Sequence, residues 1–175
     1  MENLERLNNL YAAMLEYFKG DPRRCQHWIK VHSLSRMIGL NEHLAEHTLY
    51  VLEAAAMVHD CGIKPGEAKY GRNDGKIQEQ EGPDAAAKLL AALDFGAVDI
   101  ERICFLVGHH HTYNVIDSID FQILVEADFL VNFYEDNMDK KAIESCVKKI
   151  FKTQTGKKFA CAMFGLGGDD DAAQN

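Results

Sequence analysis

Three consecutive histidines, His109 to His111, lie well inside the chain in the stretch FLVGHHHTYN. Imidazole nitrogens are common ligands of divalent transition metals, so the run predicts a metal site. Successive helical residues are about 100° apart, so His109 and His111 diverge by about 200° if the preceding helix continues through the run. We expect His110 to be the best ligand, His111 the second and His109 a bystander. His110 is placed first because it continues the inward stripe of Ile103, Leu106 and Val107.

Other histidines and aspartates also continue the apolar faces of predicted helices. His27 and Asp128 are each flanked by apolar residues at helical spacing, and His59 and Asp60 end the alanine-rich helix LYVLEAAAMVHD. A carboxylate buried in such a place needs a cation, which for Asp128 is either a metal or a core lysine or arginine. His32 is interpreted as a surface residue. The flanking residues are Val31, Leu34 and Ile38 for His27, and Leu124, Val125 and Val131 for Asp128.

The elements that position these side chains are all predicted to be helices. Apolar residues recur at helical spacing and no stretch alternates convincingly with period two, so the fold class is all-α. Asp21 and Pro22 suit the N-cap and the first position of a helix. Residues 62–76, rich in Gly, Lys and Arg, are predicted to be a functional loop, such as a lid. Helices are expected at residues 4–18, 22–39, 42–60, 83–93, from Asp99 to the histidine run, at 119–135, and once or twice within 139–164.

Composition sets the class of protein. The 175 residues are expected to form one domain over residues 1–165, followed by a disordered tail at 166–175. A net charge of -8 argues against a nucleic-acid polymer as partner. The five cysteines form no C-x-x-C pair, which fits reduced thiols in the cytoplasm. Since the sequence begins without a signal-peptide pattern and no apolar run reaches about 20 residues, we expect a soluble, cytoplasmic protein without a membrane partner. A homodimer is compatible with the sequence.

The order of the inward-facing residues is His27, His59-Asp60, His110 and Asp128, and it resembles the HD superfamily of metal-dependent phosphohydrolases. HWIKVHSLS is similar to the first-helix pattern of that family, AAAMVHDCG to its eponymous motif and LVEADFL to its last-ligand helix. The resemblance covers roughly residues 20–135. The complete set of motifs is far more specific than any one of them, because His-Asp dipeptides are common by chance.

This resemblance implies a metal centre and a reaction. One or two divalent ions (Fe, Mn, Zn, Ni, Co or Mg) would be held by histidine and carboxylate ligands, and a metal-bound hydroxide would attack phosphorus. The implied substrate is a small phosphorylated compound, a nucleotide above all. The implied ligands are His27, His59, Asp60, His110 and Asp128, with His111 and Glu81 as further candidates.

Four basic residues near the His-Asp pair are predicted to bind the substrate phosphates: Lys64, Lys69, Arg72 and Lys76. Asp60 and Lys64 are the predicted catalytic residues. Two departures from the family pattern bear on these roles. Many members have a lysine four residues after the motif histidine, where this chain has Ile63, and two-metal members have a histidine where QEGPDAAA has Glu81. The number of metal ions therefore stays open.

Three other functions are compatible with the sequence. HLAEH, residues 43–47, matches the H-x-x-E-H pattern of inverted zinc peptidases, with His43 and His47 as ligands. Some HD-like proteins use a di-iron centre to activate oxygen, and ligand types alone do not separate this chemistry from hydrolysis. A non-catalytic regulatory HD module is the third alternative.

Overall fold

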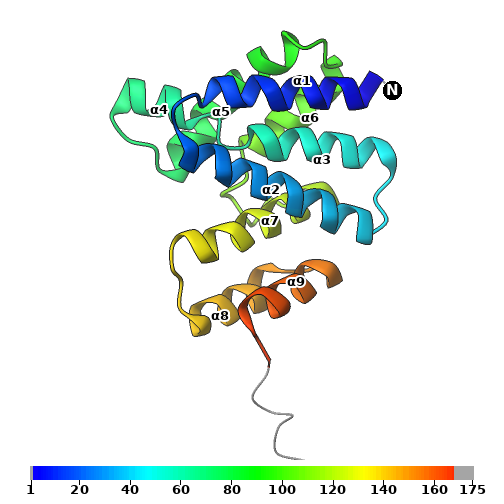
Figure 1. Ribbon diagram of the computed structural model, residues 1–175, viewed down its shortest axis with the longest axis vertical. Coiled ribbons are helices and arrows are strands. Elements are labelled where there is room, and N and C mark those ends of the chain that lie inside the picture. The colour runs from blue at the N-terminus through cyan, green and yellow to red at the C-terminus, as the bar shows by residue number, and fades with distance from the viewer. Residues whose placement is uncertain (1, 168–175) are drawn as a thin grey trace, which may run out of the picture.

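A computed structural model describes residues 2–167, and the secondary structure in that range is entirely helical (Figure 1). The predicted all-α class is therefore confirmed. The described helices are α1 Glu2–Tyr17, α2 Pro22–Asn41, α3 Glu46–Val58, α4 Ile63–Tyr70, α5 Gly75–Ala91, α6 Ala97–Val107, α7 Ile119–Glu135, α8 Lys140–Ile150 and α9 Gln154–Phe164.

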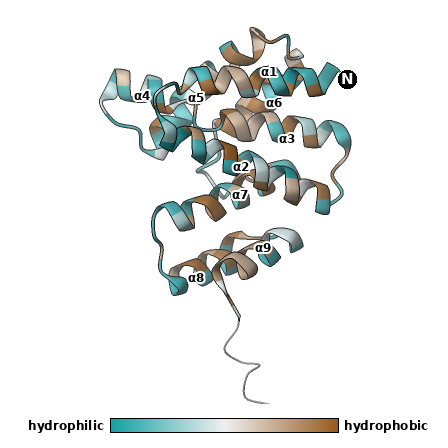
Figure 2. Cartoon of the chain, in the orientation of Figure 1, coloured by the Kyte–Doolittle hydropathy of each residue, from teal (hydrophilic) through white to brown (hydrophobic). Residues whose placement is uncertain are grey.

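Helix α3 lies at the centre of the fold. Every residue from Leu49 to Val58 is buried, and all of these except Glu53 are hydrophobic, as expected of a helix in the core. Helices α1, α2, α6 and α7 pack around it, while α8 and α9 pack together beneath α7 (Figure 1). Most of these outer helices alternate between apolar and polar residues around their circumference, so each buries one face (Figure 2).

The start of α2 follows from its cap. The Asp21 carboxylate accepts a hydrogen bond from the Arg24 amide at 3.1 Å, and Pro22 occupies the start of the helix, as the sequence predicts. This cap fixes the first turn of α2 and therefore the direction of His27 in the next turn. No described helix has the length and apolarity needed to cross a membrane.

The predicted loop at residues 62–76 is wrong in its first half, where α4 spans Ile63–Tyr70. This short helix ends at Gly71, whose φ of 67° is favourable for glycine. Eight residues give too few turns for an apolar stripe to show, which is why the glycine- and lysine-rich composition pointed to a loop. Only a short connection, residues 71–74, separates α4 from α5.

Helix α5 begins earlier than predicted, at Gly75, and Pro83 lies inside it and does not open it. The helix tolerates this proline because its neighbours hold it closely. A Cβ on Gly82 would lie 2.6 Å from Val107 Cγ1, and one on Gly62 would lie 2.5 Å from the Gln78 carbonyl oxygen. Tertiary packing therefore overrides the local preference of proline for a helix start.

The predicted boundaries of the other elements need smaller changes. The turn at residues 42–45 precedes α3, and α6 begins before Asp99, which lies in its first turn. Residues 139–164 form two helices, α8 and α9. Of the predicted tail, Leu166 packs against the core, and residues 168–175 lie outside the described part.

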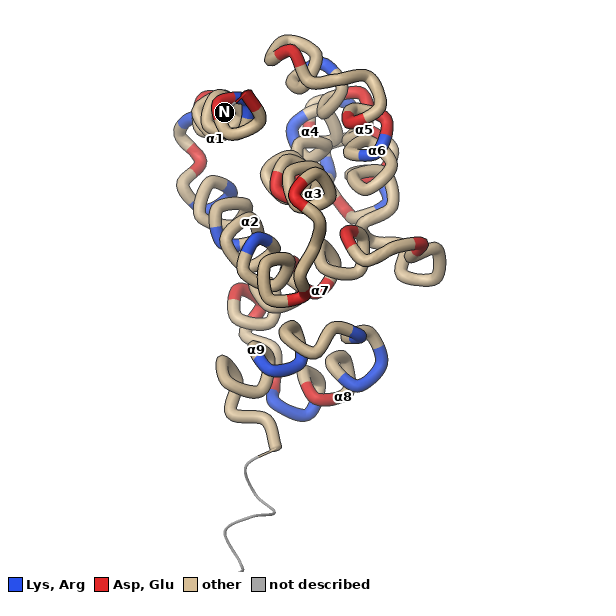
Figure 3. The backbone as a smooth tube through the Cα atoms, turned by 90° about the vertical axis from the view of Figure 1, so that its right-hand side faces the viewer, with Lys and Arg blue, Asp and Glu red and all other residues tan. Residues whose placement is uncertain are grey.

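Charge is unevenly distributed along the chain. Residues 140–158 contain seven lysines and one glutamate, whereas residues 1–139 contain 12 basic and 23 acidic residues. Figure 3 shows the lysines on α8 and α9. The part of the molecule that contains the predicted ligands is therefore acidic, so an anionic ligand there needs a metal ion or specific basic side chains.

Candidate metal centre

The turn that follows α3 carries His59 and Asp60, and His27 of α2 faces this turn. The Nε2 atoms of His27 and His59 are 3.2 Å apart. Asp60 Oδ2 lies 3.4 Å from His27 Nε2 and 3.6 Å from His59 Nε2. These three ligand atoms are close enough together to bind one ion.

Asp128 of α7 and His110, which follows α6, complete this group. Asp128 Oδ1 lies 3.2 Å from His27 Nε2 and 3.6 Å from His59 Nε2, and His110 Nε2 lies 3.8 Å from Asp60 Oδ1. Asp128 therefore contacts two histidines, whereas the alternative to a metal ligand was an ion pair between Asp128 and a core lysine or arginine. We refer to these five residues, His27, His59, Asp60, His110 and Asp128, as the His/Asp cluster.

The histidines of the cluster are oriented by their other ring nitrogens. His59 Nδ1 lies 2.9 Å from the Ala56 carbonyl oxygen and His110 Nδ1 lies 2.7 Å from that of Val107. His27 Nδ1 lies 3.0 Å from a Glu135 carboxylate oxygen. If each Nδ1 donates to its oxygen, each Nε2 presents a lone pair to the cluster, which is the usual arrangement of metal-binding histidines.

The donor set fits a divalent metal ion. His110 Nε2 is buried and has no hydrogen-bond partner among the described residues. The Nε2 atoms of His27 and His59 converge on the same carboxylates, although two lone pairs that face each other repel unless a proton or a cation lies between them. Three imidazoles and two carboxylates suit Fe, Mn, Zn and similar ions.

The pKa values show how the cluster balances its charge. Burial alone would lower the pKa of His27, but its contacts with Asp128 and Asp60 raise it to about 9. Burial alone would raise the pKa of Asp60 and of Asp128, yet the neighbouring histidines hold the pKa of both carboxyls below the usual range. The carboxylates therefore stay ionised, and a divalent ion would displace the proton from His27.

The histidine run lies in a turn, because α6 ends at Val107. The prediction that the helix continues through the run is wrong. The ranking of the three histidines as ligands therefore cannot rest on their angles around a helix. His110 is nevertheless fully buried in the cluster, and the His111 ring packs on it with centroids 4.0 Å apart. His109 points elsewhere: it stacks on Phe105, and its Nδ1 lies 2.7 Å from the Phe105 carbonyl oxygen.

His111 forms a second group of potential ligands with Asp60 and His110. Burial and the proximity of His110 lower the pKa of His111 to about 4, so its ring is neutral at pH 7. Gln78 Oε1 lies 2.9 Å from His111 Nε2, and Glu79 accepts a hydrogen bond from the His111 amide at 3.0 Å. Sequence reasoning missed both residues, since nothing local links α5 to this turn.

Glu135 and Asn132 were also missed, although the sequence carries a signal for them. They follow Asp128 by seven and four residues, so the three side chains share one face of α7. Asn132 donates to Asp128 Oδ1 at 3.0 Å, while Glu135 contacts His27 and forms an ion pair with Lys30. Both residues therefore support cluster ligands.

A cavity of about 330 Å³ opens onto His27 and Asp60, and we call it the cluster cavity. It is lined by Asp21, Arg23, Arg24, His27, Asp60, Ile63, Asn73, Asn132 and Glu135. Arg23 and Arg24 could not be predicted from the sequence as lining residues, because their position relative to the cluster depends on the packing of α2 against α7.

The four predicted phosphate-binding residues do not line the cluster cavity. Lys64 and Lys69 line a larger cavity of about 610 Å³ between α1, α4 and α5. Lys64 donates to the Tyr17 carbonyl oxygen at 2.7 Å, and Arg72 pairs with Asp74 at 3.1 Å. Lys76 is exposed. The larger cavity is lined by none of the residues of the His/Asp cluster.

Glu81, the further candidate for a second ion, is buried and already paired. It forms an ion pair with Lys69 and accepts a hydrogen bond from the Tyr70 hydroxyl at 3.1 Å. The bond with Lys69 holds the pKa of the Glu81 carboxyl below its usual range. Glu81 belongs to neither group of potential ligands, so a second ion would have to displace Lys69 to use it.

The H-x-x-E-H motif does not form a peptidase site. That site requires both histidines on one helical face, but α3 begins at Glu46 and His43 lies in a turn with φ of 57°. His47 pairs with Asp99 at 3.1 Å. His32, predicted to lie at the surface, is half-buried and its Nε2 lies 3.0 Å from Glu53 Oε1.

Comparisons with known proteins were made by sequence and by structure, and a solved structure is among the matches. The chain matches no protein-family model and no curated protein. It is similar to the crystal structure of a predicted HD superfamily hydrolase from an uncultured Thermotogales bacterium, with 25% sequence identity and a TM-score of 0.61. The match covers 92% of this chain and 84% of the other.

Proposed function

Because the chain belongs to the HD superfamily, we propose that it is a metal-dependent phosphohydrolase. Its substrate is a small phosphorylated compound, and within that class we propose a nucleotide. The neighbouring structure is itself described as a predicted hydrolase, which agrees with this proposal.

The observation that carries the proposal is a buried cluster of three imidazole Nε2 atoms and two ionised carboxylates, in which His27 and His59 contact Asp60 and Asp128, and His110 contacts Asp60. A divalent ion held by these residues would supply an acidified water molecule and would polarise a phosphoryl oxygen, so phosphoester hydrolysis would need no nucleophilic side chain. Asp60 is common to both groups of potential ligands. It is therefore the residue best placed to orient both the ion and a water molecule beside it.

A covalent mechanism through the adjacent thiol is unfavourable. Cys61 follows Asp60 directly but is fully buried, and its Sγ donates to the Gly82 carbonyl oxygen at 3.3 Å. Burial raises the pKa of the Cys61 thiol, so the nucleophilic thiolate does not form near neutral pH. The chemistry thus depends on the His/Asp cluster.

We expect hydrolysis to require a divalent ion. Chelator-treated protein should release no phosphate from p-nitrophenyl phosphate or from a panel of nucleotides, and addition of Mn²⁺, Fe²⁺, Co²⁺ or Zn²⁺ should restore release with at least one of them. Phosphate release and oxygen uptake are measured in the same samples. Oxygen uptake with Fe²⁺ and no phosphate release would favour the di-iron oxygenase. The absence of both oxygen uptake and phosphate release would favour a non-catalytic module. Undiminished phosphate release without metal would refute the mechanism.

A further inference from the structure

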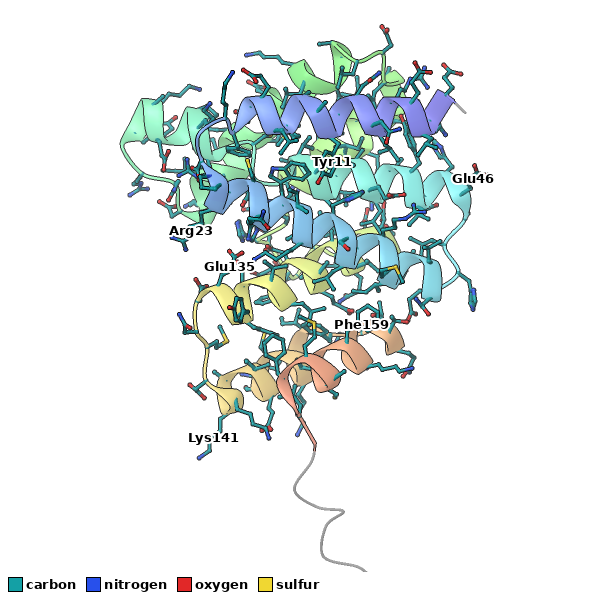
Figure 4. All side chains as sticks on the ribbon, viewed as in Figure 1. Tyr11, Arg23, Glu46, Glu135, Lys141 and Phe159 are labelled. Atoms are coloured by element: carbon teal, nitrogen blue, oxygen red, sulfur yellow. The ribbon has the colours of Figure 1, made fainter. Side chains whose placement is uncertain are left out.

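The cluster cavity has a buried end and an exposed rim. His27 and Asp60 lie at the buried end, at the site of the proposed reaction, and Arg23 is exposed. In Figure 4, Arg23 at the start of α2 and Glu135 at the end of α7 lie on facing sides of this region. A substrate whose reacting phosphoryl group lies at the cluster therefore extends past Arg23 toward solvent.

The acidic side chains of the cavity are already paired. Asp21 caps α2 and lies 3.2 Å from Arg24 Nη1, and Glu135 forms its ion pair with Lys30. Asp21 and Glu135 thus each lie against a basic side chain, and Asp60 at the buried end contacts His27 and His59.

The remaining polar groups of the lining are also bonded. Arg24 Nη2 lies 2.5 Å from Glu67, and Asn73 donates to the same carboxylate at 2.9 Å. Asn132 is bonded to Asp128. Within residues 2–167, the guanidinium of Arg23 has neither an ion pair nor a side-chain hydrogen bond, so Arg23 is the cation of this lining that is free to bind a ligand.

We propose that Arg23 is a specificity-determining residue that binds a second phosphate of the substrate, next to the phosphoryl group at the His/Asp cluster. This deepens the proposed function and rests on it: the preferred substrates carry two or more linked phosphates, as nucleoside di- and triphosphates do. A guanidinium matches phosphate geometry with two parallel hydrogen bonds. A cavity of about 330 Å³ is at the small end of ligand sites, in keeping with a polar pocket that holds the phosphates.

The test compares two ligands that differ by one phosphate. Binding of AMP and of methylene-bridged ADP, which resists cleavage at the bridge, is measured by calorimetry in the presence of Mn²⁺. The unmodified protein should bind the ADP analogue at least about 10-fold more tightly, and Arg23→Gln should lose most of that preference, by about 10- to 100-fold, which is the range expected for hydrogen bonds to charged groups. Arg23→Lys should keep part of it, because lysine retains the charge but not the planar pair of donors.

Lys19→Gln is the matched control. It also removes one positive charge close to the start of α2, but Lys19 pairs with Glu16 and does not line the cavity. Its preference for the ADP analogue should equal that of the unmodified protein. The proposal is overturned if the unmodified protein shows no preference, if Arg23→Gln keeps it, or if Lys19→Gln loses it equally. Failure of the proposed function would be seen separately, as absence of phosphate release while this binding preference persists.

Discussion

Asp60→Asn is expected to lose metal and to reduce phosphate release by more than about 100-fold. Replacement of residues that merely support metal ligands already costs about 10- to 100-fold, and Asp60 contacts the ligand nitrogens of His27, His59 and His110 directly. Asparagine keeps the size of the side chain but removes its negative charge. Metal content is measured by mass spectrometry after dialysis, and activity by phosphate release.

Asp117→Asn is a suitable control, because Asp117 is an exposed aspartate that pairs with Arg102 outside the cluster. It should keep the metal content and activity of the unmodified protein. Thermal unfolding of all samples would show whether Asp60→Asn is folded. If folded Asp60→Asn retains both metal and activity, Asp60 is not the central ligand.

The three histidines of the run should differ strongly in their effects on metal binding. His110→Ala should empty the site, because it removes a buried nitrogen that has no other described partner. His111→Ala should be partly impaired, since His111 borders Asp60 and His110 in the second group of potential ligands. His109→Ala should be nearly silent, because His109 stacks on Phe105.

This series is its own control, since the three variants make the same substitution at neighbouring positions in one turn. Metal content and phosphate release should rank His109→Ala above His111→Ala and His111→Ala above His110→Ala. A site that stays occupied in His110→Ala but is empty in His109→Ala would contradict the arrangement of this turn.

The inward direction of the cluster residues could be predicted from the sequence. His27 and Asp128 lie within helices, where the apolar stripe indicates which side chains face the core, and His59-Asp60 ends an apolar helix. His110 was placed inward for a reason that the structure does not support, since α6 ends before it.

The sequence does not indicate which helices pack against one another. Helical spacing indicates in which direction a side chain points from the axis of its own helix. It does not indicate which neighbouring helix that side chain contacts. The contact of Gln78 with His111 and the sharing of one cavity by Arg23 and Glu135 depend on tertiary packing. For the same reason the sequence assigned phosphate binding to the lysines of α4, which lie along a different cavity.

The most direct test of this account is anomalous diffraction from crystals of the protein grown with Mn²⁺. The account predicts a peak within the His/Asp cluster, with His and carboxylate ligand atoms at about 2.0–2.3 Å from the ion. The ligand nitrogens should be the Nε2 atoms of His27, His59 and His110. A cluster without a peak in crystals that bind Mn²⁺ elsewhere would contradict it.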